Sequence, residues 1–193
     1  MFISFEGGEG AGKSTQIERL AARLRGLGHE VMTTREPGGT PGAEAIRTLL
    51  VEGEPGGWSA KAEALLVNAA RADHVEKRIR PALARGAIVL CDRFVHSTLA
   101  YQGGGRGLAS EWLLELHRLS TGDLWPDLAL FLDLPADTGL ARAAQGRFEA
   151  EGLAFHERIA AAFRGMGLVR IDASGAPDEV EQRIWGEVEP LLS

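Results

Sequence analysis

Cysteine is nearly absent from this chain of 193 residues, since Cys91 is the single one. One cysteine cannot form an intrachain disulfide, so the sequence excludes disulfide-stapled secreted domains and favours a reducing compartment. Long apolar runs are missing too, because the stretch Leu128–Leu132 is far shorter than the roughly 20 residues that cross a bilayer. Glu6 and Glu9 interrupt the apolar character begun by Phe2–Phe5, which argues against a signal peptide. We therefore expect a cytoplasmic protein without a membrane span.

A surplus of positive charge is also lacking. The net charge is −6, and lysine occurs only at Lys13, Lys61 and Lys77, so the other basic residues are arginines. A nucleic-acid surface needs a basic patch to neutralise phosphates, so no nucleic-acid partner is expected. Small nucleotides are compatible with this charge, because a few arginines in one cleft bind phosphate whatever the total.

Short apolar runs alternate with helical patterns along the chain, as in a parallel sheet covered by helices. Five runs have the length and composition of strands: Phe2–Phe5, Val31–Thr34, Ala87–Cys91, Leu128–Leu134 and Leu168–Ile171. The length suits one hydrophobic core. We predict a three-layer α/β/α fold with a five-stranded parallel sheet, in a single domain over residues 1–193.

Caps and apolar spacing mark the helices between these strands. Helix starts are expected at or next to Lys13, Thr40, Ser59, Ser110 and Pro177. Two apolar stripes are Ile17, Leu20, Leu24 and Leu27, and Leu113, Leu116 and Leu119. The helix after Ser59 is expected to bury a face made of Ala62, Leu65, Leu66, Ala69 and Ala70.

Three segments read as interruptions of regular structure. Glu52–Gly57 has the composition of a loop, and Gln102–Gly107 is too glycine-rich for a helix or strand. The stretch from Ala136 to about Arg164 is helical but is broken at Gly146 and Gly152.

The strongest motif lies between the first strand and the first helix. Gly7 and Gly12 bracket four residues ahead of Lys13 and Ser14, which matches a phosphate-binding loop. Glycines tolerate the positive φ angles that turn backbone N–H groups toward an anion, and the following helix adds its dipole. Lys13 is suited to the β- and γ-phosphates and Ser14 to Mg²⁺. The motif predicts nucleotide binding; an incidental glycine-rich turn is the plainer alternative.

An acid and an arginine directly follow the strand Ala87–Cys91. In a doubly wound sheet the carboxyl ends of strands face the ligand crevice. Asp92 can hold Mg²⁺ or its water shell there, and Arg93 can clamp phosphate oxygens. The alternative is an ordinary turn aspartate beside a surface arginine.

Two classes of protein share the phosphate loop. A GTPase switch needs a guanine-reading Asn-Lys-x-Asp segment, whereas the only asparagine, Asn68, is followed by Ala69. A kinase of a small acceptor needs further arginines and a lid that excludes water. Arg142 and Arg147 lie in the glycine-interrupted segment, which we predict to be a lid over residues 136–152. A kinase is favoured over a switch, with an ATP-driven motor or assembly protein as a weaker alternative.

Further motifs make the chain resemble bacterial thymidylate kinases over essentially its whole length. The matching segments are Phe5–Ser14, Thr34–Thr40, Ala69–Arg71, Asp92–Phe94, Ala100–Gly107 and Arg147–Glu149. The Asp-Arg-aromatic and Tyr-Gln-Gly-Gly-Gly pair is far more specific than the phosphate loop alone. The resemblance implies a homodimeric P-loop kinase that uses Mg-ATP to convert dTMP to dTDP.

The resemblance also implies roles for individual residues. ATP is expected to contact Gly7, Gly8, Glu9, Gly10, Ala11, Gly12, Lys13, Ser14, Thr15 and Arg142. The acceptor is expected to contact Glu9, Glu36, Pro37, Val67, Arg71, Arg93, Thr98, Tyr101 and Gln102. The catalytic residues are expected to be Lys13, Arg93 and Arg147, and the Mg²⁺ ligands Ser14 and Asp92.

Within the acceptor set, Arg93 is implied to grip the 5′-phosphate and Arg71 to bond the thymine edge, with Thr98 and Gln102 nearby. Tyr101 is implied to crowd the 2′ carbon and so favour deoxyribose. Each role has a plainer alternative: Arg71 and Gln102 as surface residues, and Tyr101 as a ring that packs between helices.

The chain departs from the family pattern in two places. Val67 stands where the family commonly has an aromatic that stacks on thymine, so ring stacking of about 0.5–1.5 kcal/mol is not expected from that position. The lid is short, and its basic residues reduce to Arg142 and Arg147. Another nucleoside monophosphate kinase on the same scaffold is therefore the second reading.

Overall fold

The computed structural model describes residues 1–52, 56–143 and 146–192, in which strands and helices alternate. The strands are β1 (Phe2–Glu6), β2 (Val31–Arg35), β3 (Ile88–Asp92), β4 (Leu128–Asp133) and β5 (Val169–Asp172). The helices are α1 (Lys13–Gly26), α2 (Pro41–Val51), α3 (Ala60–His74), α4 (Arg80–Ala84), α5 (Val95–Thr98), α6 (Ser110–Thr121), α7 (Ala136–Arg142), α8 (Leu153–Arg164) and α9 (Pro177–Val188). Short π-helical or 3₁₀ turns are η1 (Val75–Ile79), η2 (Leu99–Gly105), η3 (Glu149–Glu151) and η4 (Glu189–Leu191).

The five strands form one parallel sheet in the order β2-β3-β1-β4-β5. Every predicted strand is confirmed to within about one residue at each end. The central strand β1 is buried along its whole length, as expected of a strand covered on both faces. In its register Phe5 lies beside Asp92, so the strand that leads into the phosphate loop adjoins the strand that ends in the predicted metal ligand.

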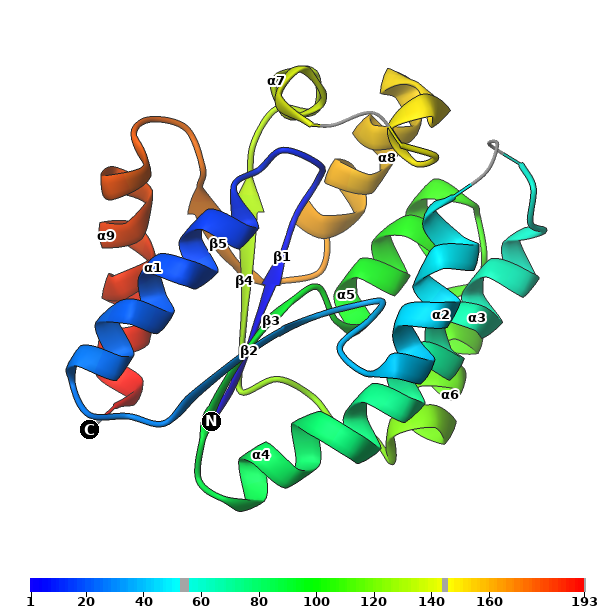
Figure 1. Cartoon of the computed structure of the whole chain (residues 1–193). Helices are drawn as coiled ribbons and strands as arrows, with labels where there is room; N and C mark the ends of the chain where they lie inside the picture. The colour runs from blue at the N-terminus through cyan, green and yellow to red at the C-terminus, as the bar shows by residue number, and fades with distance from the viewer. Residues whose placement is uncertain (53–55, 144–145, 193) are drawn as a thin grey trace.

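Helices cover both faces of the sheet, which confirms the three-layer α/β/α prediction (Figure 1). Side chains alternate along β1: Ile3 and Phe5 pack with α1 and α9 on one face. Phe2 packs on the other face with Phe94 and the residues of η1. A third apolar cluster joins η2 and α8 beside β4. In the described ranges no helix has the length and apolar content needed to cross a bilayer.

Side-chain caps set the starts of α2 and α3 as predicted. The Thr40 hydroxyl accepts a hydrogen bond from the Ala43 amide at 3.1 Å, and the Ser59 hydroxyl accepts one from Ala62 at 3.3 Å. Apolar spacing predicts the last residue of two helical apolar stripes less well. Leu27 and Leu119, which end these stripes, are 58% and 67% exposed.

The predicted apolar face of α3 is buried only in part, since Ala70 is buried and Ala62 and Leu66 are half-buried. Leu65 is 51% exposed and Ala69 is exposed, whereas Glu63, Asn68 and Arg71 are buried. These polar side chains are buried because each has hydrogen-bonding partners on other elements. Apolar periodicity cannot anticipate a helix that turns its polar side inward.

The prediction of irregular structure at Gln102–Gly107 is also wrong for most of that stretch, which continues the π-helical turn η2. Its glycines serve close packing against α8. A Cβ on Gly104 would lie 2.6 Å from the Ala162 Cβ, and one on Gly105 would lie 2.6 Å from a ring carbon of Phe155. The break at Gly152 is confirmed, with φ 86° ahead of α8. Parts of the predicted loop Glu52–Gly57 and of the predicted lid, residues 53–55 and 144–145, lie outside the described residues.

Candidate active site

The phosphate loop follows β1 at the carboxyl edge of the sheet, where β3 also ends. Gly7, Gly10 and Gly12 have φ angles of 142°, 64° and 86°, which side chains with a Cβ rarely adopt. Lys13 donates from Nζ to the Gly8 carbonyl at 2.8 Å and to the Gly7 carbonyl at 3.3 Å. Burial lowers the pKa of Lys13, and the nearby Arg93 cation lowers it further. The loop therefore has the backbone geometry and the lysine of an anion site.

A polar cavity of about 380 Å³ lies over this loop. Its lining is Glu9, Gly10, Ala11, Gly12, Lys13, Ser14, Thr15, Arg35, Glu36, Arg47, Asp92, Arg93 and Arg142. Basic side chains outnumber acidic ones here although the whole chain is acidic. Such a cavity suits the phosphates of a nucleotide, and we call it the phosphate cavity.

Ser14 and Asp92, the two predicted Mg²⁺ ligands, both line this cavity and lie within hydrogen-bonding distance of each other. The Ser14 hydroxyl donates to Asp92 Oδ2 at 3.0 Å, and Asp92 Oδ1 is buried without a partner in the described ranges. No group of three or more His, Cys, Asp or Glu side chains that could hold a metal unaided occurs among these residues. Mg²⁺ in phosphate-transfer sites binds through one or two protein oxygens together with substrate phosphates and water. The residues present therefore fit Mg²⁺ bound with a nucleotide.

Arg93 lies between the phosphate cavity and a second cavity, and it lines both. Its backbone has the left-handed φ of 69°, and its backbone N–H donates a hydrogen bond to the Phe5 carbonyl at 2.9 Å. The guanidinium donates to the Gly7 carbonyl at 2.7 Å and to Glu9 at 2.9 Å. Burial alone lowers the pKa of Arg93, but the Glu9 carboxylate raises it above its usual value. A fixed cation thus stands at the junction of the two cavities.

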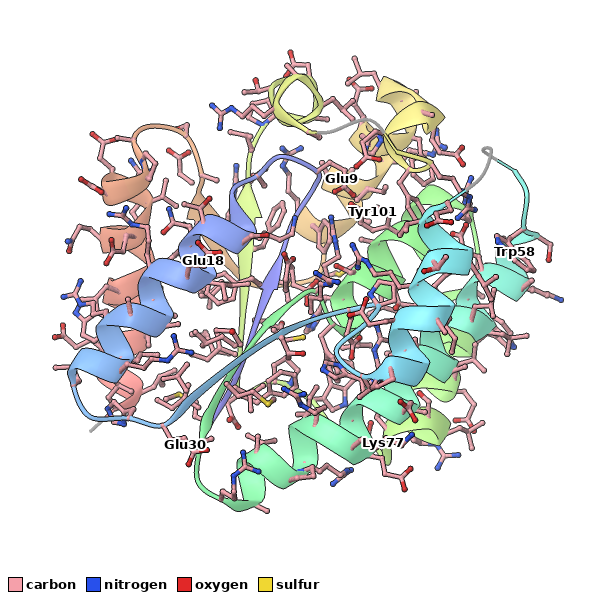
Figure 2. All side chains as sticks on the ribbon, in the orientation of Figure 1. Glu9, Glu18, Glu30, Trp58, Lys77 and Tyr101 are labelled. Atoms are coloured by element: carbon pink, nitrogen blue, oxygen red, sulfur yellow. The ribbon has the colours of Figure 1, made fainter. Side chains whose placement is uncertain are left out.

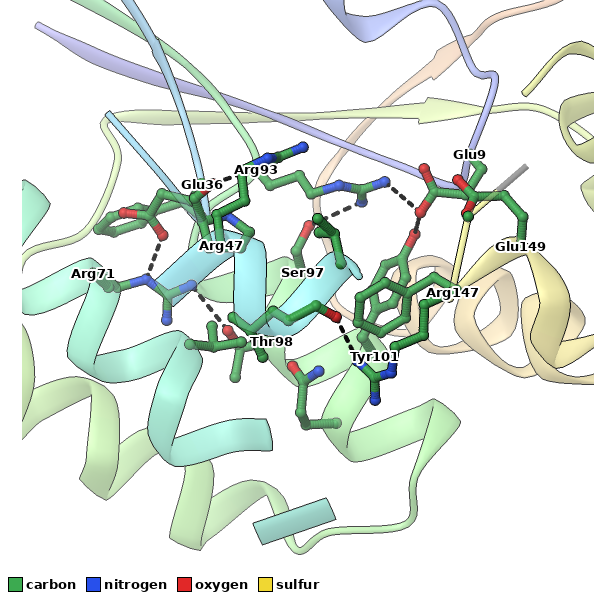
Figure 3. Close-up of a pocket in the computed structure, with 18 residues that line it drawn as sticks. Glu9, Glu36, Arg47, Arg71, Arg93, Ser97, Thr98, Tyr101, Arg147 and Glu149 are labelled. Atoms are coloured by element: carbon green, nitrogen blue, oxygen red, sulfur yellow. Dashed lines mark hydrogen bonds and ion pairs between the residues drawn. The ribbon is translucent and has the colours of Figure 1, made fainter. Parts of the chain in front are cut away.

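The second cavity has a volume of about 370 Å³ and is more apolar; we call it the acceptor cavity. Glu9 and Tyr101 both line it and lie next to each other, and the tyrosine hydroxyl donates to Glu9 at 2.7 Å (Figures 2 and 3). Burial alone raises the pKa of Glu9, but the charges of Arg93 and Lys13 outweigh it and lower the pKa to about 2. Glu9 is therefore an anion over the whole physiological range.

A buried guanidinium, that of Arg71, lines the acceptor cavity (Figure 3). Arg71 donates from Nε to Glu36 at 2.6 Å and from one terminal nitrogen to Thr98 at 2.9 Å. Glu36 in turn hydrogen-bonds His74 at 3.0 Å. Arg71 is 1% exposed and stacks over the Phe94 ring at 5.1 Å, so its orientation is fixed from several sides. A rigid donor of this kind suits recognition of a polar ring edge.

All the predicted acceptor-binding residues line this one cavity. They are Glu9, Glu36, Pro37, Val67, Arg71, Arg93, Thr98, Tyr101 and Gln102. The two cavities share Glu9, Glu36, Arg47 and Arg93. A phosphate donor and a ring-bearing phosphate acceptor therefore have adjoining places that meet at Arg93.

Comparison with known proteins agrees with a site that binds a phosphate donor beside a phosphate acceptor. A family model for thymidylate kinases matches residues 5–184. The chain belongs to the thymidylate kinase family. Thymidylate kinase from Thermomicrobium roseum is 54% identical over 202 residues, covering 99% of this chain and 95% of the relative. That from Caulobacter vibrioides is 60% identical over 166 residues, with 84% and 80% covered.

A solved structure extends the likeness to the fold. The crystal structure of thymidylate kinase from Ehrlichia chaffeensis superposes with a TM-score of 0.79 at 32% identity, covering 100% of this chain and 98% of that one. Members of the thymidylate kinase family are nucleoside monophosphate kinases that phosphorylate dTMP to dTDP with ATP. A donor cavity joined to an acceptor cavity is the arrangement this chemistry needs.

The two arginines of the predicted lid line different cavities. Arg142 lies in the phosphate cavity, whereas Arg147 lies in the wall of the acceptor cavity. The Arg147 guanidinium donates to the Leu50 carbonyl at 2.6 Å and pairs with Glu63, and its side chain is fully buried. A catalytic role for Arg147, which remains a prediction, requires it to leave these partners. Gly7 and Gly8 accept hydrogen bonds from Lys13 through their carbonyls and line neither of the two cavities.

Sequence reasoning missed several residues of the thymidylate kinase site. Arg47 on α2 lines both cavities and donates to the Pro37 carbonyl at 2.8 Å. Phe94 and Phe148 bring aromatic rings to the cavity that Val67 also lines, so aromatic contact with a base need not come from position 67. The sequence signal for Arg47 was only a basic residue on a helix that follows the Glu-Pro-Gly-Gly-Thr turn.

Glu63 is a further missed residue, and it joins three segments. Its buried carboxylate accepts from Gln102 at 2.8 Å and from Arg106 at 3.3 Å, and it pairs with Arg147. Arg106 also binds Glu151 at 2.6 Å, so the cluster ties α3 and η2 to the predicted lid. These charges balance, which makes the cluster tolerable in the interior only while every member is present.

Glu63→Ala is expected to lower the free energy of unfolding by about 3–5 kcal/mol, because the buried Arg147 guanidinium loses its counter-charge and the half-buried Arg106 loses one of its two carboxylate partners. Urea denaturation followed by circular dichroism measures this. The control is Glu115→Ala, which removes a carboxylate of an exposed ion pair with Arg118 and should leave the midpoint nearly unchanged. Equal midpoints for the two variants would contradict the account of the Glu63 cluster.

Proposed function

We propose that this chain phosphorylates dTMP with Mg-ATP and releases ADP and dTDP. The observation that carries the proposal is the pair of cavities joined at Arg93, since transfer requires donor and acceptor phosphates to meet in line. ATP places its phosphates on the loop Gly7–Thr15, and dTMP places its base near Arg71 with its 5′-phosphate at Arg93. The predicted lid, residues 136–152, supplies Arg142 and Arg147.

The chemistry assigned to the protein is positioning and neutralisation of charge. Lys13 and Arg93 hold donor and acceptor phosphates against their mutual repulsion, and Glu9 keeps Arg93 oriented. Bound Mg²⁺, held by Ser14 and by Asp92 directly or through water, neutralises the donor oxygens. The surrounding residues exclude water, so that transfer to the acceptor outcompetes hydrolysis.

The test is identification of the product by mass spectrometry after incubation with ATP, MgCl₂ and dTMP. We expect dTDP and ADP in equal amounts, no product with excess EDTA, and recovery when Mg²⁺ is added back. ADP without dTDP would mean that the chain is an ATPase and not a kinase of dTMP.

Tyr101 is expected to set the preference for deoxyribose. Its ring lines the acceptor cavity and is held by edge contacts to Phe148 and Phe155, so it has little freedom to make room for a 2′-hydroxyl. Tyr101→Ala should narrow the kcat/KM ratio of dTMP to ribothymidine monophosphate by about tenfold, the scale of a small steric difference in a pocket. Tyr101→Phe, which keeps the ring and loses only the bond to Glu9, should keep the ratio. If Tyr101→Ala leaves the ratio of the two kcat/KM values unchanged, Tyr101 only packs against its neighbours and does not select deoxyribose.

We also propose that the protein is a cytoplasmic homodimer. Large apolar side chains are exposed on the packed helices α2, α3 and α6, with Leu49 at 49%, Leu65 at 51% and Leu119 at 67%. Apolar groups on neighbouring helices support an interface with a second copy. Sedimentation equilibrium should give twice the chain mass, and Leu65→Glu should shift the protein toward monomer; a monomeric parent would refute the proposal.

A further inference from the structure

Helix α7 rests with its backbone directly on the phosphate loop, at a contact between two glycines. A Cβ on Gly139 would fall well inside 3.0 Å of the Glu9 carbonyl oxygen, and a Cβ on Gly10 would clash as badly with the Gly139 carbonyl. Cβ atoms essentially never approach other atoms within 3.0 Å. Both obstacles are backbone oxygens, which cannot rotate aside as a flexible side chain can. Glycine on both sides is what allows this approach.

Arg142 stands on the same helix, one turn after Gly139, and lines the phosphate cavity. The other basic side chains of that cavity are engaged: Lys13 with two carbonyls, Arg35 with Glu44, Arg47 with a carbonyl and Arg93 with Glu9. Within residues 1–52, 56–143 and 146–192, by contrast, the Arg142 side chain forms no hydrogen bond or ion pair. Its charge is therefore available to an anion in the cavity.

We propose that Gly139 is a positioning residue that sets where Arg142 stands relative to the phosphates of ATP. The inference rests on the proposed binding of ATP phosphates in this cavity. Because α7 sits on the very loop that carries the phosphates, the distance from guanidinium to phosphate is fixed by backbone contact. Misplacement of a binding group by about 1 Å can cost up to about 100-fold in rate. Arg142 occupies this place in the structure without any rearrangement, so its contribution falls on ATP binding.

The test is Gly139→Ala, with Gly186→Ala as the matched control. Both glycines lie in helices, and alanine is the better helix former at each. A Cβ at Gly186 meets nothing within 4 Å, whereas one at Gly139 pushes α7 off the loop. We expect the KM for ATP to rise about tenfold in Gly139→Ala, with the KM for dTMP within about twofold. Gly186→Ala should match the parent in both constants.

A double-mutant cycle separates positioning from a general structural effect. Arg142→Ala should raise the KM for ATP by at least as much as Gly139→Ala, and the double variant should be no worse than Arg142→Ala alone. Additive losses would overturn the inference, because Gly139 would then act through something other than Arg142. An unchanged KM for ATP in Arg142→Ala would also overturn it, while leaving dTMP phosphorylation by the parent unaffected.

If circular dichroism shows that Gly139→Ala does not fold, a second variant that moves the arginine tests whether its position sets the KM for ATP. In Arg142→Ala/Ala143→Arg the net charge is kept, but the arginine is shifted by one position at the end of α7. We expect the KM for ATP to stay as high as in Arg142→Ala, since the placement of the charge is what counts. Recovery of the parental KM would overturn the inference.

Discussion

Arg93→Met is expected to lower kcat/KM for dTMP about 10³-fold, which corresponds to about 4 kcal/mol of transition-state stabilisation. Arg93 lines both cavities, as Arg47 does, and unlike Arg47 it is held against the phosphate loop by hydrogen bonds to Gly7 and Glu9. Its loss removes the charge that grips the acceptor phosphate. It also leaves the Glu9 carboxylate beside that phosphate without its counter-charge, which adds to the penalty.

The measurement is steady-state kinetics with saturating ATP, supported by circular dichroism to show that the variant folds. Arg118→Met is the control, because Arg118 is exposed, lies on α6 and pairs with the exposed Glu115. The control should match the parent. A kcat/KM for Arg93→Met within about tenfold of the parent, under about 1.4 kcal/mol, would exclude the assigned role.

Arg147→Ala is expected to lower kcat about 10³-fold, toward the lower end of the effect of an arginine that stabilises transferring phosphate. The phosphate loop itself carries only one basic side chain, Lys13, so a second cation must come from elsewhere. In the structure Arg147 pairs with Glu63 and donates a hydrogen bond to the Leu50 carbonyl, and it does not line the phosphate cavity. A residue that reaches the phosphates only after changing partners acts on the transition state and leaves ATP affinity unchanged.

The two lid arginines are therefore distinguished by which constant they change. Arg142, already in the phosphate cavity, should affect the KM for ATP, and Arg147 should affect kcat. The control for the latter is Arg158→Ala on α8, an exposed arginine that lines neither cavity. If Arg147→Ala leaves kcat within about threefold and raises only the KM for dTMP, Arg147 is a wall of the acceptor cavity and not a catalytic residue.

Local features of the sequence predicted the sheet and the phosphate loop well. Strands such as Ile88–Asp92 are buried on both faces and read as continuous apolar runs, and the loop Gly7–Ser14 has a spacing dictated by backbone geometry. Caps at Thr40 and Ser59 are also local, because each hydroxyl bonds an amide three residues on. Interactions within a few residues leave a pattern in the sequence that can be recognised directly.

Contacts between distant segments were not predictable in the same way. Glu63 and Arg147 lie 84 positions apart, and nothing in either neighbourhood shows that they pair. The burial of Glu63 and Arg71 on α3 was not expected from the apolar residues of that helix, because paired charges can outweigh apolar periodicity. The glycines of η2 read as irregular structure, whereas they are required by the approach of α8. Such features depend on the tertiary arrangement and not on local preference.

The most direct test of the central claim is ADP release measured across a panel of acceptors: dTMP, dUMP, dCMP, dGMP, AMP and thymidine. In the proposed function the base lies near Arg71 and the acceptor phosphate lies at Arg93, and both arginines line the acceptor cavity. We predict the highest kcat/KM for dTMP and no turnover of thymidine, which offers Arg93 no phosphate. Faster phosphorylation of AMP or thymidine than of dTMP would contradict the account.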